Sequence, residues 1–382
     1  MTDLVWYFFK LGSVGFGGPA ALVGYMRRDL VEDRKLIDES TYNLSIALAQ
    51  IMPGPLAAQT AMAIGYFQAG VIGASLVGLA FILPSFVMVL GLGVVYVAYG
   101  GLPWMQAVFY GIGAVIIAIL AVAAYRLARG TNKRDAVLWT VFAVTFAATV
   151  WTGSELAVVF ILSGLAVLVI RAWPGHRPGL VLLVAGLVTA LAIAWLERTV
   201  GGVNSARQQP VLLQILLFFG KAGSFVFGSG LAIVPFLQQG VVHDFGWLSQ
   251  HQFLDAVAVA LITPGPVVIT VAFIGYLVAG VAGAILAAIG IFLPVYVFTV
   301  VPAPWFARHR HNPQLRAFAT GATSAASGAI AGAVVVLGRQ AIVDVATACI
   351  AIIGLVVLTR FRTPEALLVL GAGLAGLLLS PH

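Results

Sequence analysis

Two lysines stand inside apolar stretches of the sequence, and a serine follows each lysine three residues later. The pairs are Lys10 with Ser13 and Lys221 with Ser224. An ionisable side chain within an apolar membrane segment is costly and marks function by default. Residues three apart share one face of a helix, so each lysine and its serine project together. Two ammonium groups and two hydroxyls suit a small divalent oxyanion of tetrahedral shape.

Four short glycine and proline runs interrupt the same apolar stretches. They are Gly17-Gly18-Pro19, Pro53-Gly54-Pro55, Gly228-Ser229-Gly230 and Pro264-Gly265-Pro266. Glycine permits backbone angles closed to other residues and proline removes a hydrogen bond, so one helix ends and another begins at each run. A new helix N-terminus offers unpaired N–H groups and a partial positive charge, which attract anions. We therefore expect the four breaks and the two Lys-Ser pairs to bind the substrate.

The chain contains its own sequence twice, at an offset of 211. Residues 8–20 (FFKLGSVGFGGPA) and 219–231 (FGKAGSFVFGSGL) are identical at six of thirteen positions, and the same offset superimposes the two Pro-Gly-Pro runs. Proline and glycine also serve as plain kinks and packing points in membrane helices. Duplicated hydrophobic halves with matching breaks, however, are typical of secondary transporters whose site lies between the repeats.

The composition predicts an all-α polytopic membrane protein. Hydrophobic residues make up 61% of the chain and charged residues 9%, against about 25% charged in soluble domains. Residues 40–125 and 256–307 contain no charged residue or histidine, and each stretch exceeds the roughly 20 residues that span a bilayer. The basic residues are scattered over loops, so no nucleic-acid partner is expected. Cys349 is the single cysteine, and no metal site, cofactor or catalytic residue is expected.

The apolar segments divide as six, one and six. This pattern predicts an N-terminal repeat (1–175), a linker with one transmembrane helix (176–210) and a C-terminal repeat (211–382). A single crossing between two six-segment halves turns the second half upside down. The N-terminus shows no cleavable signal peptide.

The loop charges agree with this inverted topology. Loop 26–41 carries four Lys/Arg and its counterpart 239–253 carries none, whereas hairpin 99–106 carries none and its counterpart 302–316 carries three. Cytoplasmic loops of membrane proteins are enriched in Lys and Arg. The basic bias thus changes side between the copies, as an inverted repeat requires.

For every loop to lie on its favoured side, the four broken segments must enter and leave the membrane on the same face. Re-entrant helical hairpins that meet near the midplane satisfy this, because irregular backbone at membrane depth is tolerated where it lines a cavity. Fifteen loop Lys/Arg are then cytoplasmic and three external, with the N-terminus inside and the C-terminus outside. The alternative is thirteen full crossings with kinks, which puts loop 26–41 outside, where its five acids offset its bases.

Other polar residues are weaker candidates. Asp255 is the acid at the edge of a broken segment, where it either carries a coupling proton or lies at a hydrated helix end. Arg27 and Arg28 form a vestibule for anions or act as topology anchors. Four further side chains flank the Pro-Gly-Pro runs and contact either substrate or a neighbouring helix: Gln50, Gln59, Thr60 and Thr270.

The motifs resemble those of the chromate ion transporter family. The first copy carries FGGP with Lys-x-Gly-Ser upstream, then RRDLVEDRKLIDE and ALAQIMPGPLAAQTAMAIGY. The second copy, FGSGLAIVPFL followed by LITPGPVVITVAFIGY, resembles the other half of the long, two-domain members. The likeness covers residues 5–130 and 213–340, and the remaining helices fit in number and order.

This resemblance implies an antiporter in the inner membrane that exports chromate, driven by the proton-motive force, with sulfate as a competitor, and so gives chromate resistance. Gly17–Pro19 and Pro53–Pro55, with their counterparts, would be the signature positions. The second copy departs from the pattern by having Ser229-Gly230 where the first has Gly18-Pro19.

The residues themselves support a tetrahedral dianion, so an inward permease for sulfate or another small anion remains the alternative. A homodimer is common among such transporters. An integral membrane enzyme is disfavoured because the apolar segments offer no pair of carboxylates or histidines.

Overall fold

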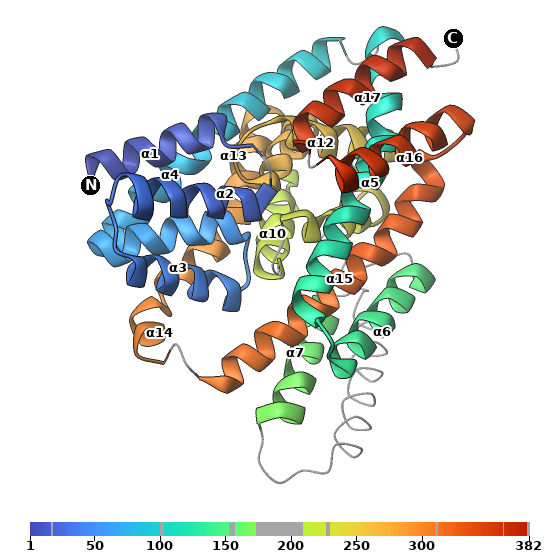
Figure 1. Cartoon of the computed structure of the whole chain (residues 1–382). Helices are drawn as coiled ribbons and strands as arrows, with labels where there is room; N and C mark the ends of the chain where they lie inside the picture. Colours follow the sequence, from blue (N-terminus) through green and yellow to red (C-terminus); the bar gives the residue numbers. More distant parts are fainter. Residues whose placement is uncertain are drawn as a thin grey trace.

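The computed structural model describes residues 1–16, 18–99, 103–152, 157–172, 209–226, 230–309, 312–361 and 363–379. Within these ranges the chain is helical and forms no strand, which confirms the predicted all-α class (Figure 1). The predicted linking helix of segment 176–210 falls almost entirely outside the described residues.

The helices of the two halves follow one another in the same order. The first half consists of α1 (Thr2–Val14), α2 (Gly18–Arg27), the π-helical η1 (Arg28–Asp33), α3 (Glu39–Ile51), α4 (Leu56–Tyr99), α5 (Pro103–Asn132), α6 (Ala136–Thr152) and α7 (Ala157–Ala172). The second half consists of α10 (Val211–Ser224), the 3₁₀ turn η2 (Gly230–Ile233), α11 (Val234–Gln238), the π-helical η3 (Gln239–Asp244), α12 (Gln250–Ile262), the 3₁₀ turn η4 (Val267–Ile269), α13 (Thr270–Val300), α14 (Ala303–His309), α15 (Pro313–Ala341), α16 (Val345–Arg360) and α17 (Glu365–Leu379). Even the π-helical segments recur at the offset of 211.

The first broken segment folds back on itself. The Arg34 guanidinium lies 5.6 Å from the centre of the Tyr7 ring, although a continuous helix between these residues would be about 40 Å long. The second half repeats this contact with apolar rings, since Phe218 and Phe245 lie 5.6 Å apart and stand 211 positions later. α1 with α2–η1, and α10 with α11–η3, are therefore helical hairpins.

The second broken segment also forms a hairpin. α3 packs against α4, and one apolar cluster joins Leu44 and Leu48 of α3 to Ala63 and Phe67 of α4. This register brings the start of α3 beside residues well past the break. The four breaks are thus tips of hairpins, as the re-entrant prediction requires, and the broken segments do not run straight through.

α3 and α12 begin with matching caps. The Asp38 carboxylate accepts a hydrogen bond from the Thr41 N–H at 3.2 Å, and Ser249, which stands 211 positions later, caps α12 in the same way. Such caps satisfy N–H groups that have no partner inside the helix. Hydrogen bonds from the hydroxyls of Ser40 and Thr41 lower the pKa of Asp38 to about 2, so this exposed cap is ionised.

α4 reverses direction after thirteen residues. Ala69 and Gly70 have non-helical backbone angles (φ −147° and +61°), and the matching pair at 279–280 has φ of −145° and +60°. The carbonyl oxygen of Gly73 lies 2.4 Å from where a Cβ of Gly65 would stand. Eight residues of straight helix would hold these two positions about 12 Å apart, so the chain turns back here.

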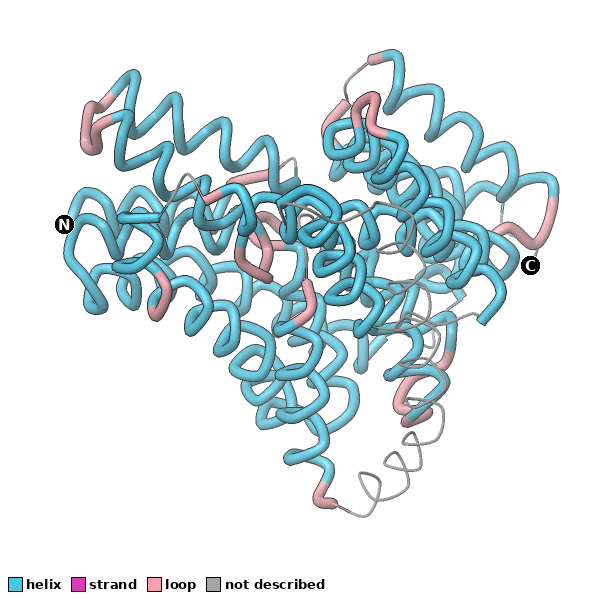
Figure 2. The backbone as a smooth tube through the Cα atoms, turned by 90° about the horizontal axis from the view of Figure 1, so that it is seen from below, coloured by secondary structure: helices cyan, strands magenta, loops and turns pink. Residues whose placement is uncertain are grey.

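The remaining helices exchange partners between the halves. α5 packs against α16 and α17 of the second half, α15 packs against α6 and α7 of the first, and α5 and α15 pack against each other. Figures 1 and 2 show this bundle beside the group that contains α1–α4, α10 and α13. Neither half therefore forms a separate globule.

In the part of the chain that the structure describes, four helical stretches are long and apolar enough to cross a membrane: Leu56–Tyr99, Trp104–Asn132, Val267–Arg308 and Pro313–Ala341. Shorter apolar helices accompany them, among them α6, α10, α16 and α17. Large apolar side chains are exposed along α4, α13, α16 and α17, where a bilayer would cover them. The chain is a multi-pass membrane protein.

The reversal in α4 gives a stability prediction. Replacing Gly65 by alanine places a methyl group against the Gly73 carbonyl and should destabilise the protein by about 1–3 kcal/mol through overpacking. Gly91, in the same helix, has open space where its Cβ would stand, so Gly91→Ala is the matched control. Thermal unfolding in detergent should show a lower Tm for Gly65→Ala alone. Equal midpoints for both variants would contradict the close approach.

Candidate functional site

One cavity of about 1470 Å³ borders all four breaks. Its lining includes Pro19, the last residue of the first break, and one residue directly after each of the other three breaks: Leu56, Leu231 and Val267. α2 and α4 begin at or just before these residues, so their N-termini face this region. The structure thus brings the interrupted segments of both halves to one place.

Two backbone hydrogen bonds join the breaks across the halves. The Gly54 N–H donates to the Val226 carbonyl at 2.6 Å, and the Gly265 N–H donates to the Gly15 carbonyl at 2.9 Å. The two bonds are equivalent: the donors Gly54 and Gly265, and the acceptors Gly15 and Val226, each stand 211 positions apart. Each Pro-Gly-Pro run is therefore held by the first break of the opposite half.

The close approach at the second Pro-Gly-Pro run requires glycine. Gly265 has φ of +95°, and a Cβ there would lie 1.9 Å from the Ser85 Oγ. The Ser85 hydroxyl in turn donates to the Gly12 carbonyl at 3.1 Å. Gly54 has φ of +147°, and a Cβ there would lie 2.5 Å from the Cδ atom of Gln59. A larger residue at Gly265 would push the hairpin tips of the two halves apart, whereas one at Gly54 would displace the Gln59 side chain of the same hairpin.

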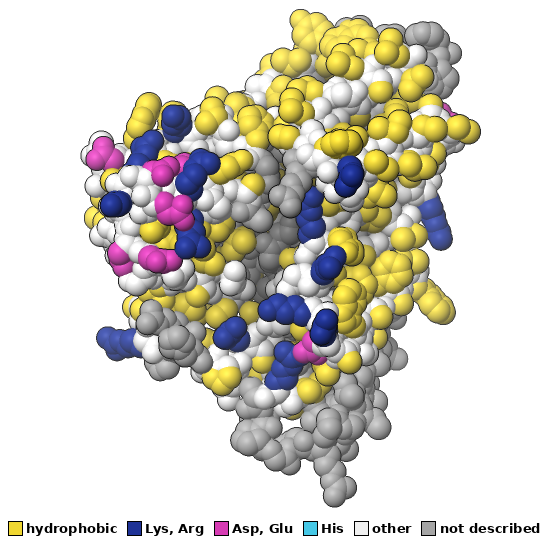
Figure 3. Space-filling view, viewed as in Figure 1, with side chains coloured by type: hydrophobic (Ala, Val, Ile, Leu, Met, Phe, Trp, Pro, Cys, Tyr) yellow, Lys and Arg dark blue, Asp and Glu magenta, His cyan; other side chains and the backbone are white. Residues whose placement is uncertain are grey.

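The cavity walls carry an excess of positive charge. Basic side chains on the lining are Arg126, Lys133, Arg134, Arg171 and Arg316, and the acids are Asp135 and Glu365. Neutral hydrogen-bonding groups come from Ser40, Asn43, Gln50, Thr131, Asn132, Thr320 and Thr323. Figure 3 shows a hollow in this face with Lys and Arg side chains along one side of it. A cleft lined by one sign of charge raises the local concentration of the opposite ion.

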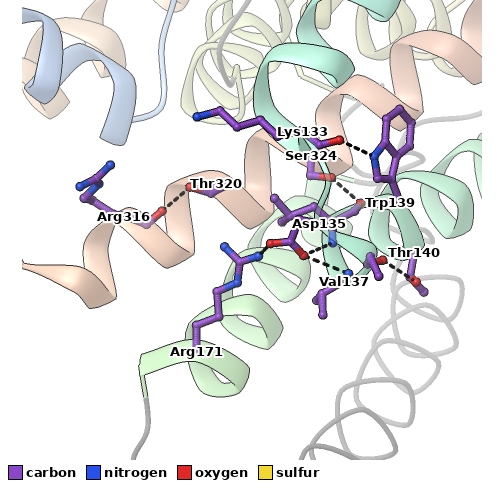
Figure 4. A network of polar contacts seen from close by, with 11 residues as sticks. Lys133, Asp135, Val137, Trp139, Thr140, Arg171, Arg316, Thr320 and Ser324 are labelled. Atoms are coloured by element: carbon purple, nitrogen blue, oxygen red, sulfur yellow. Dashed lines mark hydrogen bonds and ion pairs between the residues drawn. The ribbon is translucent and has the colours of Figure 1, made fainter.

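A polar network fixes part of this wall (Figure 4). Arg171 of α7 forms an ion pair with Asp135, whose carboxylate also caps α6 by accepting the N–H of Val137 at 3.0 Å. The Ser324 hydroxyl of α15 donates to the Leu138 carbonyl at 2.8 Å. Among the described residues, Lys133, Arg134 and Arg316 form no ion pair, so their charges remain available to an anion.

The two lysines expected at the site lie elsewhere. Lys10 and Lys221 are exposed on α1 and α10 and are not part of the cavity lining. The hydroxyls of Ser13 and Ser224 donate to carbonyls one turn earlier in their own helices, at 2.8 and 2.9 Å, which satisfies a hydroxyl within an apolar helix. Their part in substrate binding stays a prediction.

The other expected residues lie at the ends of helices. Gly18 and Pro19 open α2, and Gly230 opens η2. Pro53, Gly54 and Pro55 connect α3 to α4, and Pro264, Gly265 and Pro266 connect α12 to η4. Gly17, Gly228 and Ser229 lie outside the described residues.

The polar side chains that flank the breaks divide into two groups. Gln50 lines the cavity, whereas the hydroxyls of Thr60 and Thr270 donate to carbonyls of their own helical turns at 2.7 and 2.8 Å. Arg27 and Arg28 pair with acids of the same loop and are not part of the cavity lining. A part for Arg27 and Arg28 in an anion vestibule stays a prediction.

Asp255 lies apart from the cavity, on α12. Its carboxylate is partly buried and accepts a hydrogen bond from the Tyr96 hydroxyl of α4 at 2.6 Å. This contact joins the two halves. Its part in proton coupling stays a prediction.

The cavity cations were missed as site residues by the sequence reasoning. Arg126, Lys133, Arg134 and Arg316 stand at helix ends, where they were counted as markers of the cytoplasmic side. The signal that could have found them is the concentration of basic residues in 126–135 and in hairpin 302–316. Only the packing of α5 against α15 brings them to one cavity.

Comparison with known proteins defines the class as a membrane transporter. The model of the chromate transporter family matches the chain twice, over residues 2–170 and 213–377. The chain belongs to the chromate transporter family, and the two matches give it the two halves of the long type.

The chain is 51% identical to the chromate transport protein of Cupriavidus metallidurans, over 100% of this chain and 94% of the relative. It is 50% identical to the probable chromate transport protein of Synechococcus elongatus, over 99% of this chain and 95% of the relative. The chromate transport protein of Pseudomonas aeruginosa is 29% identical, over 98% and 91% of the two chains. No solved structure matches the chain. The family resemblance predicted from the motifs is confirmed.

The cavity cations give a binding prediction. Arg316→Gln and Arg126→Gln each remove one charge from the lining and should weaken chromate binding about tenfold, because a hydrogen bond to a charged group contributes roughly 1.5–3 kcal/mol. Arg308→Gln is the control, since Arg308 is exposed and not part of the lining. Chromate-dependent stabilisation of the detergent-purified protein against heat gives the apparent Kd. Equal Kd values in all three variants would remove the cavity from consideration as the site.

Proposed function

We propose that this protein exports chromate from the cytoplasm across the inner membrane, driven by the proton-motive force. The observation that carries the proposal is the cation-lined cavity bordered by the four breaks of the two halves. Membership of the chromate transporter family supports the substrate. Two tetrahedral dianions of the same charge, chromate and sulfate, would both fit such a cavity, so sulfate competes.

The binding chemistry follows from the lining. Arg126 and Arg316 offer guanidinium forks that bind two oxygens of one oxyanion, and Lys133 adds a point charge. The side-chain amides of Asn43 and Gln50 offer neutral hydrogen-bond donors. The N-terminal ends of α2 and α4 add partial positive charge. The anion thereby exchanges its hydration shell for fixed donors.

The orientation follows from the same residues. The basic side chains of the cavity belong to loops that the positive-inside rule assigns to the cytoplasm. The cavity then opens inward, with the N-terminus inside and the C-terminus outside. The proposed repeats are residues 1–175 and 211–382, inverted about linker 176–210. The paired hydrogen bonds of Gly54 and Gly265 support a two-fold relation between the halves.

Asp255 is the proposed carrier of the coupling proton. Its carboxylate is partly buried, contacts Tyr96 and is not part of the cation-lined cavity. A permease that takes sulfate or another small anion inward would use the same cavity. The direction of coupling separates the two functions.

The test is flux of radiolabelled chromate and sulfate in proteoliposomes with an imposed pH gradient. Wild type should show gradient-driven chromate flux that sulfate inhibits. The double variant Arg126→Gln/Arg316→Gln should lose most of this flux, and Arg308→Gln should keep it. Gradient-independent sulfate uptake would favour the permease instead.

Two further variants test whether the lysines bind substrate and whether Asp255 carries the coupling proton. In the double variant Lys10→Ala/Lys221→Ala, retained flux would exclude the lysines from binding, and a loss equal to that of the cavity variant would make them part of the site. Asp255→Asn should leave chromate binding intact but make flux insensitive to the pH gradient. Unchanged gradient dependence would exclude Asp255 as the proton carrier. Gel filtration of each variant checks that it is folded.

A further inference from the structure

The repeat assigns every cavity position a counterpart in the other half. α3 corresponds to α12 at an offset of 211, and α5 corresponds to α15 at 210, since Pro103 and Pro313 each open their helix. The counterpart of the cavity residue Leu44 is Asp255, and that of the cavity residue Ala319 is Phe109. Asp255 and Phe109 therefore mark a second region, related to the cavity by the repeat.

This second region is filled by aromatic side chains. The Tyr96 ring packs against Phe109 at 5.6 Å and against Phe273 at 5.2 Å. Its hydroxyl donates to Asp255 at 2.6 Å. Leu254, the counterpart of the cavity residue Asn43, is 5% exposed. Three aromatic rings, one leucine and one carboxylate thus occupy the region.

The charge of this region is also opposite to that of the cavity. The counterparts of Arg126 and Arg316 are Val336 and Gln106, so neither cation is repeated. The acid Asp255 replaces an apolar leucine. A dianion would be attracted to the cavity and repelled from the region of Asp255.

We propose that this region is the exit path of the substrate, closed here by a gate of Tyr96, Phe109 and Asp255. The inference rests on the proposed function. In transporters built from inverted repeats, access alternates as one set of elements rocks against the other around a fixed site. When the halves exchange conformations, the region around Asp255 opens and the cavity closes. The Tyr96–Asp255 hydrogen bond joins α4 of one half to α12 of the other and holds the gate shut.

The absence of cations gives the gate a chemical role in release. An anion that has left the guanidinium groups of the cavity meets Val336 and Gln106 in place of arginine, and a carboxylate beside them. Binding is therefore weaker on the exit side than on the entry side, which favours release outward.

The test measures access with single cysteines in the full-length protein. Cys349, which is exposed on α16, is first replaced by serine. Leu44→Cys then reports on the cavity and Leu254→Cys on the proposed exit. A membrane-impermeant maleimide is applied to vesicles of each orientation. Leu44→Cys should react from the cytoplasmic face, and Leu254→Cys should react slowly from the external face.

The gate is then weakened. Tyr96→Phe keeps the ring and removes the hydroxyl, and should raise external labelling of Leu254→Cys about tenfold, because a hydrogen bond to a carboxylate is lost. The matched control is Tyr296→Phe, which breaks another contact between the halves, the 2.7 Å hydrogen bond between Tyr296 and Ser75. Asp255→Asn, which keeps the size of the side chain, provides a second gate variant and should also raise labelling.

The outcomes separate the gate from the proposed function. Unchanged labelling in both gate variants, or an equal rise in Tyr296→Phe, would overturn the gate even if chromate flux is normal. A rise confined to the gate variants supports the gate. Absence of chromate flux in the wild type would overturn the proposed function, whatever the labelling shows.

Discussion

The structure depends on the two backbone hydrogen bonds that cross between the halves at the breaks. A helix that stops inside a membrane protein leaves N–H and C=O groups without partners in their own helix, and these groups need partners elsewhere. Gly54 and Gly265 each donate to a carbonyl at the first break of the opposite half. Neither half can satisfy these groups alone. The two bonds hold the hairpin tips of the two halves together around one cavity.

The exchange of helices between the halves has a second consequence. α5 and α15 leave the hairpin group and pack beside partners from the other half. Arg126 from the end of α5 and Arg316 from the start of α15 are thereby brought to the same cavity. The hairpin tips supply backbone and helix ends, and the exchanged helices supply charge. A binding site for a dianion needs both, because helix ends alone carry only partial charges.

Much of the fold could be predicted from the sequence because its causes are local. Glycine and proline act where they stand, so the breaks and their matching offset were visible, and the basic loops indicated hairpins over straight crossings. The site could be predicted only in part. The apolar neighbours of Lys10 and Lys221 suggested a place in the site, but both side chains are exposed, on α1 and α10, and neither lines the cavity. The positive-inside rule already explained the cavity arginines as markers of the cytoplasmic side. Their place on one cavity depends on the packing of helices that are distant in the sequence.

The two halves have nearly the same backbone angles at equivalent turns. They differ in side chains whose charge would act on an anion. The turns at 69–70 and 279–280 agree within a few degrees, whereas Arg126 corresponds to Val336 and Leu44 to Asp255. A symmetric scaffold with symmetric charges would bind a dianion equally well from either side. The backbone symmetry provides two related conformations, and the differences between the copies make one side basic and the other acidic. In the proposed exporter, the proton gradient drives the net direction of transport, and the positions where the second copy departs from the first decide on which side the dianion binds more tightly.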